Sequence, residues 1–245
     1  MNNKLNIIAE IGSVHDGSFG NALKLIDLSK ECGANIVKYQ MHIPEEESIK
    51  GAPSPNYFNE EDRYNYFKRI NFTNKEWINL YKHSKNKKLK FMVSPFSVKA
   101  LNLLIETGID YVKIASGEIT NFQLLERIAN LKVPCILSTG MSNWEEIEDA
   151  IKILSKGKIM AILQCSSIYP CPPEKIGINI ISELKKKYKY SVGLSDHSNG
   201  ELACLAALSS GATFFEKHLT FSKKMYGSDA MNAMEPNEFK SLTKN

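Results

Sequence analysis

Eight short apolar runs recur along the chain, and each run ends in small or polar residues. They span residues 7–12, 34–40, 90–97, 111–118, 135–140, 160–167, 191–197 and 213–221. Segments with helical spacing of apolar residues alternate with these runs, as in residues 21–32, where Gly33 is placed to end a helix. Continuous apolar strands separated by helices predict a parallel sheet covered on its faces. The count of eight favours an α/β fold of the (β/α)8 TIM-barrel type, a single domain over residues 1–245, and an open doubly wound sheet is the alternative.

Capping residues predict where several helices begin. The candidates are the capping-box pairs Thr73 with Glu76 and Ser142 with Glu145, and the single N-caps Ser97 and Asn121. One connection departs from the regular alternation: residues 43–72 form a polar, proline-rich and aromatic loop insert after the second strand. Long inserts on barrel loops often serve as lids, so we expect this segment to border the site.

Composition and charge remove several classes of function. No apolar run is long enough to span a bilayer, and the N-terminal residues lack the order of a signal peptide, so we expect no membrane contact and a cytoplasmic location. The net charge of +4 is spread over predicted helix faces without interleaved aromatic residues, which argues against nucleic acid as a partner. The five cysteines are odd in number and mostly lie in apolar segments, which predicts buried, reduced thiols. The first loop, residues 12–17, is not GxGxxG and no Walker motif occurs, which argues against a nucleotide-binding sheet.

The carboxyl ends of the predicted strands collect polar side chains. Active sites of this fold lie at those ends. The strand-end residues are Glu10, His15, Lys38, Gln40, His42, Ser94, Ser97, Lys113, Ser116, Glu118, Ser138, Thr139, Gln164, Ser166, Ser167, Tyr169, Ser195, Asp196, His197, Glu216 and His218. So many polar strand ends indicate a functional site rather than the edge of a core.

Two lysines among them predict a site for an anion. Lys38 and Lys113 lie on different strands, and the hydroxyl groups of Ser94, Ser116 and Ser167 end neighbouring strands. Together they would form a cradle for phosphate or carboxylate. Either lysine alone would more simply form a salt bridge at the barrel rim, and it is their combination with the serines that favours the anion site.

Two histidines predict a metal site. His197 and His218 end adjacent strands, so both imidazoles can bind one divalent ion, and Glu10 could complete the coordination or polarise a bound water. A hydrogen-bonded structural role is the alternative for a single histidine. Two histidines on neighbouring strand ends favour the metal.

A series of motifs, in order, resembles a known enzyme family. They are AEIGSVHDGS, VKYQMHI, SPFS, VKIASGEITN, ILSTGM, LQCSSIYPCPPE, GLSDHS, FFEKHLTF and GSDAMNAMEP, spread from Ile7 to Phe239. Together they resemble the N-acetylneuraminate (sialic acid) synthase family. Each motif is weak by itself, whereas the ordered set at barrel-compatible spacing is specific.

The resemblance implies a (β/α)8 barrel that condenses phosphoenolpyruvate with N-acetylmannosamine, or a related acetamido sugar, to give a nonulosonic acid and phosphate with the help of Mn2+ or Mg2+. His197 and His218 match the metal ligands of the family, and Glu10 and Glu118 match acidic residues near its reacting centre. We predict Glu10, Glu118 and Lys113 as catalytic residues. The residues that match phosphoenolpyruvate contacts are Lys38, Ser94, Lys113, Ser116, Ser167 and Ser195, and those that match sugar contacts are Gln40, Tyr169 and Asp229.

The chain departs from the family pattern in two respects. Ser94 and Ser167 stand where many relatives have threonine or asparagine near the phosphate. Full-length relatives also carry a C-terminal antifreeze-like domain that supplies a sugar-binding arginine to the partner's site. We expect this chain to lack that domain and to work as a homodimer or with a separate partner domain.

Three other functions fit parts of the pattern. The acceptor could be another aldose, as in synthases of legionaminate, pseudaminate or octulosonate type. A Schiff-base aldolase could use Lys38 or Lys113 as its nucleophile. A barrel that binds a phosphosugar without turnover is the third alternative.

Overall fold

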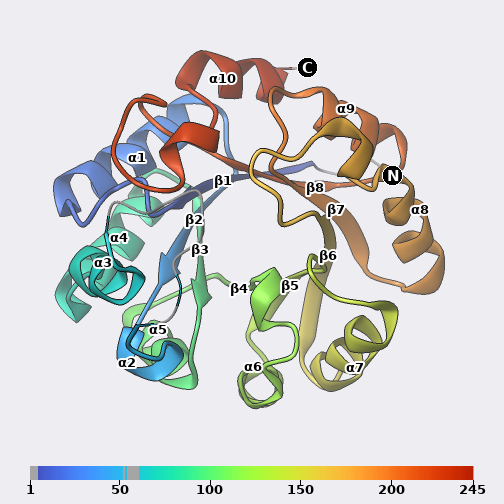
Figure 1. Cartoon of the computed structure of the whole chain (residues 1–245), viewed down its shortest axis with the longest axis horizontal. Helices are drawn as coiled ribbons and strands as arrows, with labels where there is room; N and C mark the ends of the chain where they lie inside the picture. Colours follow the sequence, from blue (N-terminus) through green and yellow to red (C-terminus); the bar gives the residue numbers. More distant parts are fainter. Residues whose placement is uncertain (1–4, 52, 54–60, 245) are drawn as a thin grey trace.

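Eight parallel strands close into a barrel, and helices surround it (Figure 1). The computed structural model describes residues 5–51, 53 and 61–244. Each strand pairs with the next along the chain, and the last pairs with the first. The strands are β1 (Asn6–Gly12), β2 (Ile36–Met41), β3 (Lys90–Pro95), β4 (Tyr111–Ile114), β5 (Pro134–Ser138), β6 (Lys158–Cys165), β7 (Ser191–Asp196) and β8 (Phe214–His218). The predicted single-domain TIM barrel is confirmed.

The helices begin close to where capping residues predict. They are α1 (Phe19–Glu31), α2 (Pro44–Glu47), α3 (Arg63–Ile70), α4 (Asn74–Asn86), α5 (Val98–Thr107), α6 (Phe122–Leu131), α7 (Trp144–Leu154), α8 (Ile178–Lys187), α9 (Leu202–Ser209) and α10 (Pro236–Lys244). Thr73 and Glu76 form the predicted capping box of α4, and Ser97 and Asn121 cap α5 and α6. Gly33, at a φ of 87°, follows the end of α1 as predicted.

The predicted capping box of Ser142 and Glu145 is wrong by one residue. Asn143 and Glu146 form the capping box of α7 instead. The Ser142 hydroxyl donates to the backbone oxygen of Gly140, at 3.4 Å, so it is engaged in the preceding turn. Asparagine and serine are about equally good N-caps, so local preference alone does not choose between adjacent positions.

Inside the barrel, the side chains form an apolar layer beneath a polar one. Side chains alternate between the two faces of a strand, so every second residue points inward. The apolar layer contains Ile8, Ile36, Met92, Ile136, Ala161, Leu163 and Phe214, all buried. A Cβ at Gly193 of β7 would meet Leu163 and the backbone oxygen of Phe214, so only glycine fits there. This layer closes the barrel beneath the carboxyl ends of its strands.

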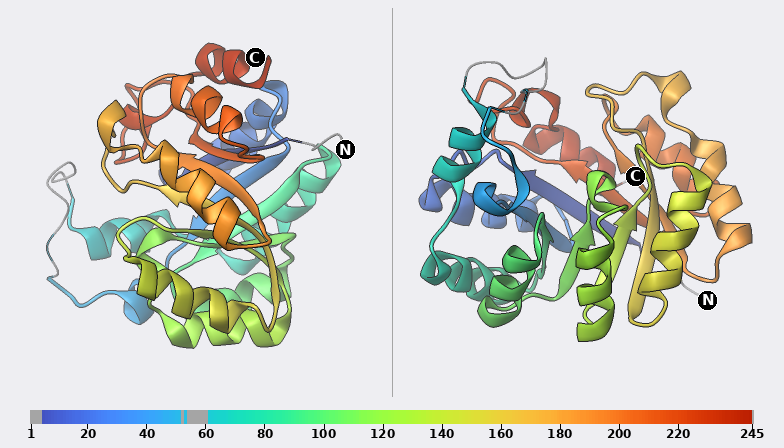
Figure 2. Two further views of the ribbon diagram at one scale, coloured as in Figure 1. Left: turned by 90° about the vertical axis from the view of Figure 1, so that its right-hand side faces the viewer. Right: turned by 60° about the horizontal axis from the view of Figure 1, so that its bottom comes forward.

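The segment predicted as a loop insert, residues 43–72, contains two helices, α2 and α3. Residues 52 and 54–60 of this segment lie outside the described part of the chain. In the left view of Figure 2, α2 and α3 project at one end of the barrel. Arg69 of α3 bonds to Asp16 in the loop after β1, with 2.8 Å between Nη2 and Oδ1, which ties the insert to the barrel.

The last helix, α10, packs against the first. Phe239 and Leu242 of α10 are buried, and the Thr243 hydroxyl donates to the backbone oxygen of Cys32 at 2.7 Å. Figure 1 shows α10 beside α1. All five cysteines are buried and none forms a disulfide, as predicted. Within the described ranges, no helix has both the length and the apolar character needed to cross a bilayer.

Candidate active site

A polar cavity of about 310 Å3 lies at the carboxyl ends of the strands. Strand alternation explains its lining, because the positions two residues beyond the apolar layer point the same way. Twelve of the thirteen predicted site residues line it: Glu10, Lys38, Gln40, Ser94, Lys113, Ser116, Ser167, Tyr169, Ser195, His197, His218 and Asp229. Ser138 of β5 also lines the cavity, so residues from all eight strands or the loops that follow them meet at one place.

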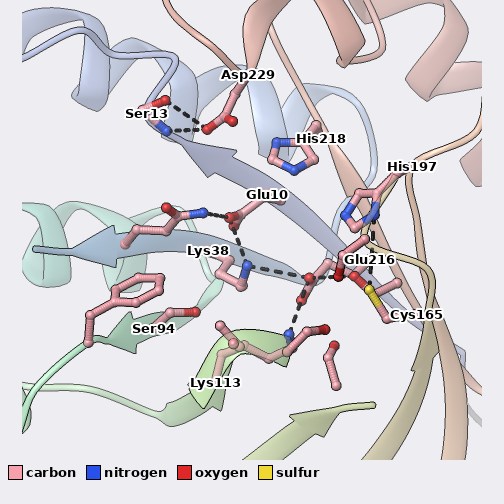
Figure 3. Close-up of a pocket in the computed structure, with 18 of the residues that line it drawn as sticks. Glu10, Ser13, Lys38, Ser94, Lys113, Cys165, His197, Glu216, His218 and Asp229 are labelled. Carbon is pink, nitrogen blue, oxygen red and sulfur yellow. Dashed lines mark hydrogen bonds and ion pairs between the residues drawn. The ribbon is translucent and has the colours of Figure 1, made fainter. Parts of the chain in front are cut away.

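A network of two lysines and two glutamates forms the floor of the cavity (Figure 3). The ammonium group of Lys38 lies 2.7 Å from Glu10 Oε1 and 3.3 Å from Glu216 Oε1. Lys113 Nζ approaches the same oxygen of Glu216 at 3.4 Å. The strand register supports this arrangement, since Glu10 pairs with Lys38 on one side and with His218 on the other. All four charged side chains of the network are buried.

The two lysines differ in their electrostatic environment. Burial alone would lower the pKa of Lys38, but the carboxylates of Glu10 and Glu216 together raise it above its ordinary value. Burial lowers the pKa of Lys113, because Glu216 offsets it only in part and Lys38 repels the second positive charge. An added anion would thus stabilise the charged form of Lys113 more than that of Lys38.

Several hydroxyl groups in the cavity are available for such an anion. Within the described residues, the buried Oγ atoms of Ser94 and Ser138 have no hydrogen-bond partner. A Cβ at Gly140 would lie 2.7 Å from the hydroxyls of both Ser116 and Ser167, so glycine there leaves these two groups at the cavity wall. Hydroxyl donors beside two ammonium groups match the needs of a phosphate or a carboxylate.

The two histidines lie side by side, as Figure 3 shows, with ring centroids 5.8 Å apart. His197 Nδ1 donates to the backbone oxygen of Ser166 at 2.9 Å, which leaves Nε2 free to bind a ligand. His218 Nδ1 is buried and has no partner among the described residues. Burial lowers the pKa of His218, which favours the neutral imidazole that binds metals, whereas for His197 burial is outweighed by the nearby Cys165, which raises the pKa.

These two imidazoles fit a divalent ion that takes further ligands from outside the protein. In the described part of the chain, no group of three or more histidine, cysteine, aspartate or glutamate side chains is arranged to hold a metal. His197 and His218 would then be the protein ligands, and water or substrate would supply the rest. Open coordination positions are typical of catalytic rather than structural metal sites.

Behind the histidines, a buried ion pair joins the two strands that carry them. Lys217 Nζ lies 2.6 Å from Asp196 Oδ2, on the outer face of the barrel. Asp196 also accepts a hydrogen bond from the backbone N–H of Ser198 at 2.8 Å. Each partner directly precedes one of the histidines, so the pair fixes the spacing of β7 and β8 beside His197 and His218.

Asp229 enters the cavity from the loop after β8. Its Oδ2 accepts hydrogen bonds from the backbone N–H and the hydroxyl of Ser13, at 2.7 and 2.8 Å. Burial alone would raise the pKa of Asp229, but His218 and these two donors lower it below its ordinary value. Figure 3 shows Asp229 above the two lysines, on the side of His218. Because an ionised carboxylate only accepts hydrogen bonds, it would recognise donor groups such as sugar hydroxyls.

Glu118 is the predicted site residue that does not line the cavity. It lies in a short 3-10 helix, Ser116–Glu118, where its Oε2 accepts a hydrogen bond from Asn121 Nδ2 at 2.8 Å.

Several other polar strand-end residues have structural roles. His15 is buried against Phe72, with ring centroids 4.6 Å apart, and Gln164 donates to the backbone oxygen of Ile176 at 3.0 Å.

Sequence reasoning gave no role to several residues of the cavity. Glu216, named only as a strand-end residue, turns out to pair with both lysines. Cys165 Sγ lies 4.0 Å from His197 Nδ1. Strand alternation could have found both, because Cys165 shares its face with Leu163 and Glu216 shares its face with His218. Arg63 and Phe67 reach the cavity from α3, so the insert borders the site as expected, although no local pattern singled out these two residues.

Comparison with known proteins gives consistent matches. The model of the NeuB family matches residues 25–245. The chain is 36% identical to an N,N'-diacetyllegionaminic acid synthase of Campylobacter jejuni, over 98% of this chain and 74% of that protein. It is 31% identical to an N-acetylneuraminate-9-phosphate synthase of Drosophila melanogaster, over 97% of this chain and 66% of that protein. The crystal structure of an N-acetylneuraminic acid synthetase from Leptospira borgpetersenii, in complex with citrate, superposes with a TM-score of 0.89 at 36% identity, covering 99% of this chain and 82% of that one.

Proposed function

Because the chain belongs to the NeuB family, we propose that it condenses phosphoenolpyruvate with an acetamido sugar to give a nonulosonic acid and phosphate. N-acetylmannosamine or a close relative is the proposed acceptor. The observation that carries the proposal is the juxtaposition of Lys38 and Lys113, which share the carboxylate of Glu216 while Glu10 pairs with Lys38 alone, beside the uncommitted hydroxyls of Ser94 and Ser138. This arrangement suits a small molecule with two anionic groups.

Phosphoenolpyruvate would bind at the floor of the cavity. Its phosphate and its carboxylate need separate cations, and Lys38 and Lys113 supply two. Hydroxyls from Ser94, Ser116 and Ser167 would complete the hydrogen bonds to its oxygens. Held in this way, the enol carbon C3 is oriented toward the upper part of the cavity, where the acceptor enters.

The acceptor sugar would bind above it, in its open-chain aldehyde form. Gln40, Tyr169 and Asp229 line the cavity and can bond to its hydroxyl and acetamido groups. His197 and His218 would hold a divalent ion, Mn2+ or Mg2+, which when bound makes the aldehyde more electrophilic.

The bond changes then follow from the positions of the chain's own groups. C3 of phosphoenolpyruvate bonds to the aldehyde carbon, the aldehyde oxygen takes up a proton, and water adds to C2. The buried Glu10, whose Oε2 has no partner among the described residues, would take the proton of that water. The C2–O bond to phosphate breaks while the new C2 hydroxyl gives its proton to the departing phosphate, which leaves the 2-keto acid and free phosphate. Lys113 stabilises the departing charge.

The test is release of phosphate from phosphoenolpyruvate on addition of N-acetylmannosamine, and of related acetamido sugars in parallel, with Mn2+ and again after chelation. We expect release that requires both sugar and metal, with a nine-carbon keto acid identified by mass spectrometry, and its loss in His197→Ala. If phosphoenolpyruvate binds but no acetamido sugar releases phosphate, the proposed synthase activity is wrong.

A further inference from the structure

His42, directly after β2, lies between two aromatic rings. Its imidazole stacks on Phe67 of α3, with ring centroids 3.7 Å apart and an interplanar angle of 12°, and on Phe96 after β3, at 4.1 Å and 17°. Only 4% of the residue is exposed. The ring is therefore held in one plane, and only its two nitrogens are left to form hydrogen bonds.

Both nitrogens of His42 are used, and they connect the insert to the reacting centre. Nδ1 lies 2.6 Å from Oε1 of Glu47, on α2. Nε2 lies 3.1 Å from Oε1 of Gln40. The amide nitrogen of Gln40 in turn donates to Glu10 Oε1 at 2.8 Å, the same oxygen that faces Lys38. A continuous chain thus joins Glu47, His42, Gln40 and Glu10.

The order of donors and acceptors along this chain can be read from its ends. The Glu10 oxygen faces an ammonium group, so it is an acceptor and Gln40 must turn its NH2 group toward it. The carbonyl oxygen of Gln40 then faces His42, so His42 must carry a proton on Nε2. The Nδ1–Glu47 contact contains one further proton, which either atom can carry. No other orientation of the Gln40 amide satisfies both neighbours.

We propose that His42 and Glu47 are positioning residues that fix the orientation of the Gln40 amide. In this orientation, one N–H of Gln40 bonds to Glu10 and the other is offered to the cavity. Gln40 therefore presents a donor, and it selects an acceptor atom on the sugar, such as a hydroxyl or carbonyl oxygen. The inference rests on the proposed function for the identity of that sugar, but the orientation of the amide does not depend on it.

The same chain couples the insert to the site. Glu47 belongs to α2 and Phe67 to α3, so both helices of the insert contact His42. Displacing either helix would remove a hydrogen bond or a stacking partner from His42. The insert thus acts on the reacting centre through the histidine, in addition to lining the cavity.

Two variants test the proposal kinetically. His42→Phe keeps a flat ring between Phe67 and Phe96 but removes both nitrogens, and Glu47→Gln removes only the carboxylate. We expect each variant to raise KM for the sugar by about three- to tenfold, with KM for phosphoenolpyruvate changed by less than about twofold. Glu46→Gln is the matched control, because Glu46 is the neighbouring glutamate of α2 and pairs with Lys99 instead. Unchanged sugar KM in both variants overturns the proposal.

A second readout needs no substrate. In protein labelled with 15N at histidine, the signals that disappear in His42→Phe identify His42 in spectra of the free wild-type protein. We expect its Nε2 to show a directly bonded, slowly exchanging hydrogen, and this exchange to become faster in Glu47→Gln but not in Glu46→Gln. An unprotonated Nε2 overturns the proposal. If the wild type uses no acetamido sugar but Nε2 is protonated, the proposed synthase activity is wrong, whereas the proposed orientation of the Gln40 amide is supported.

Discussion

At Glu216, one carboxylate faces two buried ammonium groups, at 3.3 Å from Lys38 and 3.4 Å from Lys113. The Ser195 hydroxyl donates to the same oxygen at 2.9 Å. Burial alone would raise the pKa of Glu216, but Lys113 and Lys38 lower it well below its ordinary value. Together with Glu10, Glu216 therefore offsets the charge of the two lysines.

Replacing Glu216 by glutamine leaves Lys38 with Glu10 as its remaining ion-pair partner and leaves Lys113 with none among the described residues. We expect Glu216→Gln to lower the free energy of unfolding by about 3–5 kcal/mol, the usual cost of removing one member of a buried ion pair. Added phosphate should stabilise this variant more than the wild type, because an anion can take the place of the lost charge. Denaturant unfolding with and without phosphate measures both effects.

The control for this prediction is Glu148→Gln. Glu148 forms an exposed pair with Lys187 at 2.9 Å, so its loss should change the unfolding free energy by less than about 1 kcal/mol. Equal, small effects of both substitutions would show that Glu216 is not needed for charge balance.

Among the elements, the insert is the part that sequence patterns describe least well. Strands and their order followed from apolar runs, and the N-caps of α4, α5 and α6 followed from local hydrogen-bonding chemistry. The approach of Arg63 and Phe67 to the cavity depends on how α3 packs against the barrel. The spacing of apolar residues within the insert does not predict that packing. The position of Glu118 likewise depends on a 3-10 turn after β4 that an apolar run does not predict.

Arg69 provides a test of how firmly the insert is attached. It bonds to Asp16 and to Glu61, with Nη2 2.8 Å from the first and 2.9 Å from the second carboxylate. We expect Arg69→Ala to speed amide hydrogen exchange in α3 and to leave α4 unchanged, because the lost bond to Asp16 ties the insert to the barrel and the lost bond to Glu61 lies within the insert. Global stability should change by less than about 1 kcal/mol, since the pairs are partly exposed.

Arg127→Ala is the matched control for that experiment. Arg127 of α6 bonds to Asn102 at 3.1 Å, away from the insert. Exchange in α3 should be the same in this variant as in the wild type. If Arg69→Ala also leaves α3 unchanged, the contacts of Arg69 do not hold the insert in place.

For the molecule as a whole, the barrel was the most predictable feature, because eight apolar strands alternating with helices leave few arrangements that bury them all. At the amino end of the barrel, Asp110 joins two elements, α4 and β3. It pairs with Lys85 of α4 and Lys90 of β3, and it accepts the backbone N–H of Phe91 at 2.8 Å. Although burial alone would raise the pKa of Asp110, the Phe91 N–H and Lys85 lower it overall.

This shift fixes the direction of a pH effect on stability. A carboxyl whose pKa is lowered by folding stabilises the native state above its unfolded pKa of about 4, and that contribution is lost as the pH falls through the native value. We expect Asp110→Asn to cost about 1–2 kcal/mol at pH 7, and the gap to the wild type to narrow below about pH 4. Unfolding measured from pH 7 to pH 3 checks this. The exposed Asp149→Asn is measured alongside as the surface control, and a pH-independent gap for Asp110→Asn would contradict the prediction.

The apolar layer beneath the cavity makes the site a dead end. Ile8, Met92, Leu163 and Phe214 close the barrel below the lysines, so every molecule enters and leaves by the same mouth. In the proposed reaction, a sugar bound first would block access of phosphoenolpyruvate to Lys38 and Lys113. Phosphate formed there would lie beneath the product until the product leaves. The geometry thus imposes an order on the proposed reaction. Phosphoenolpyruvate binds before the sugar, and the phosphate that it leaves departs after the nonulosonic acid.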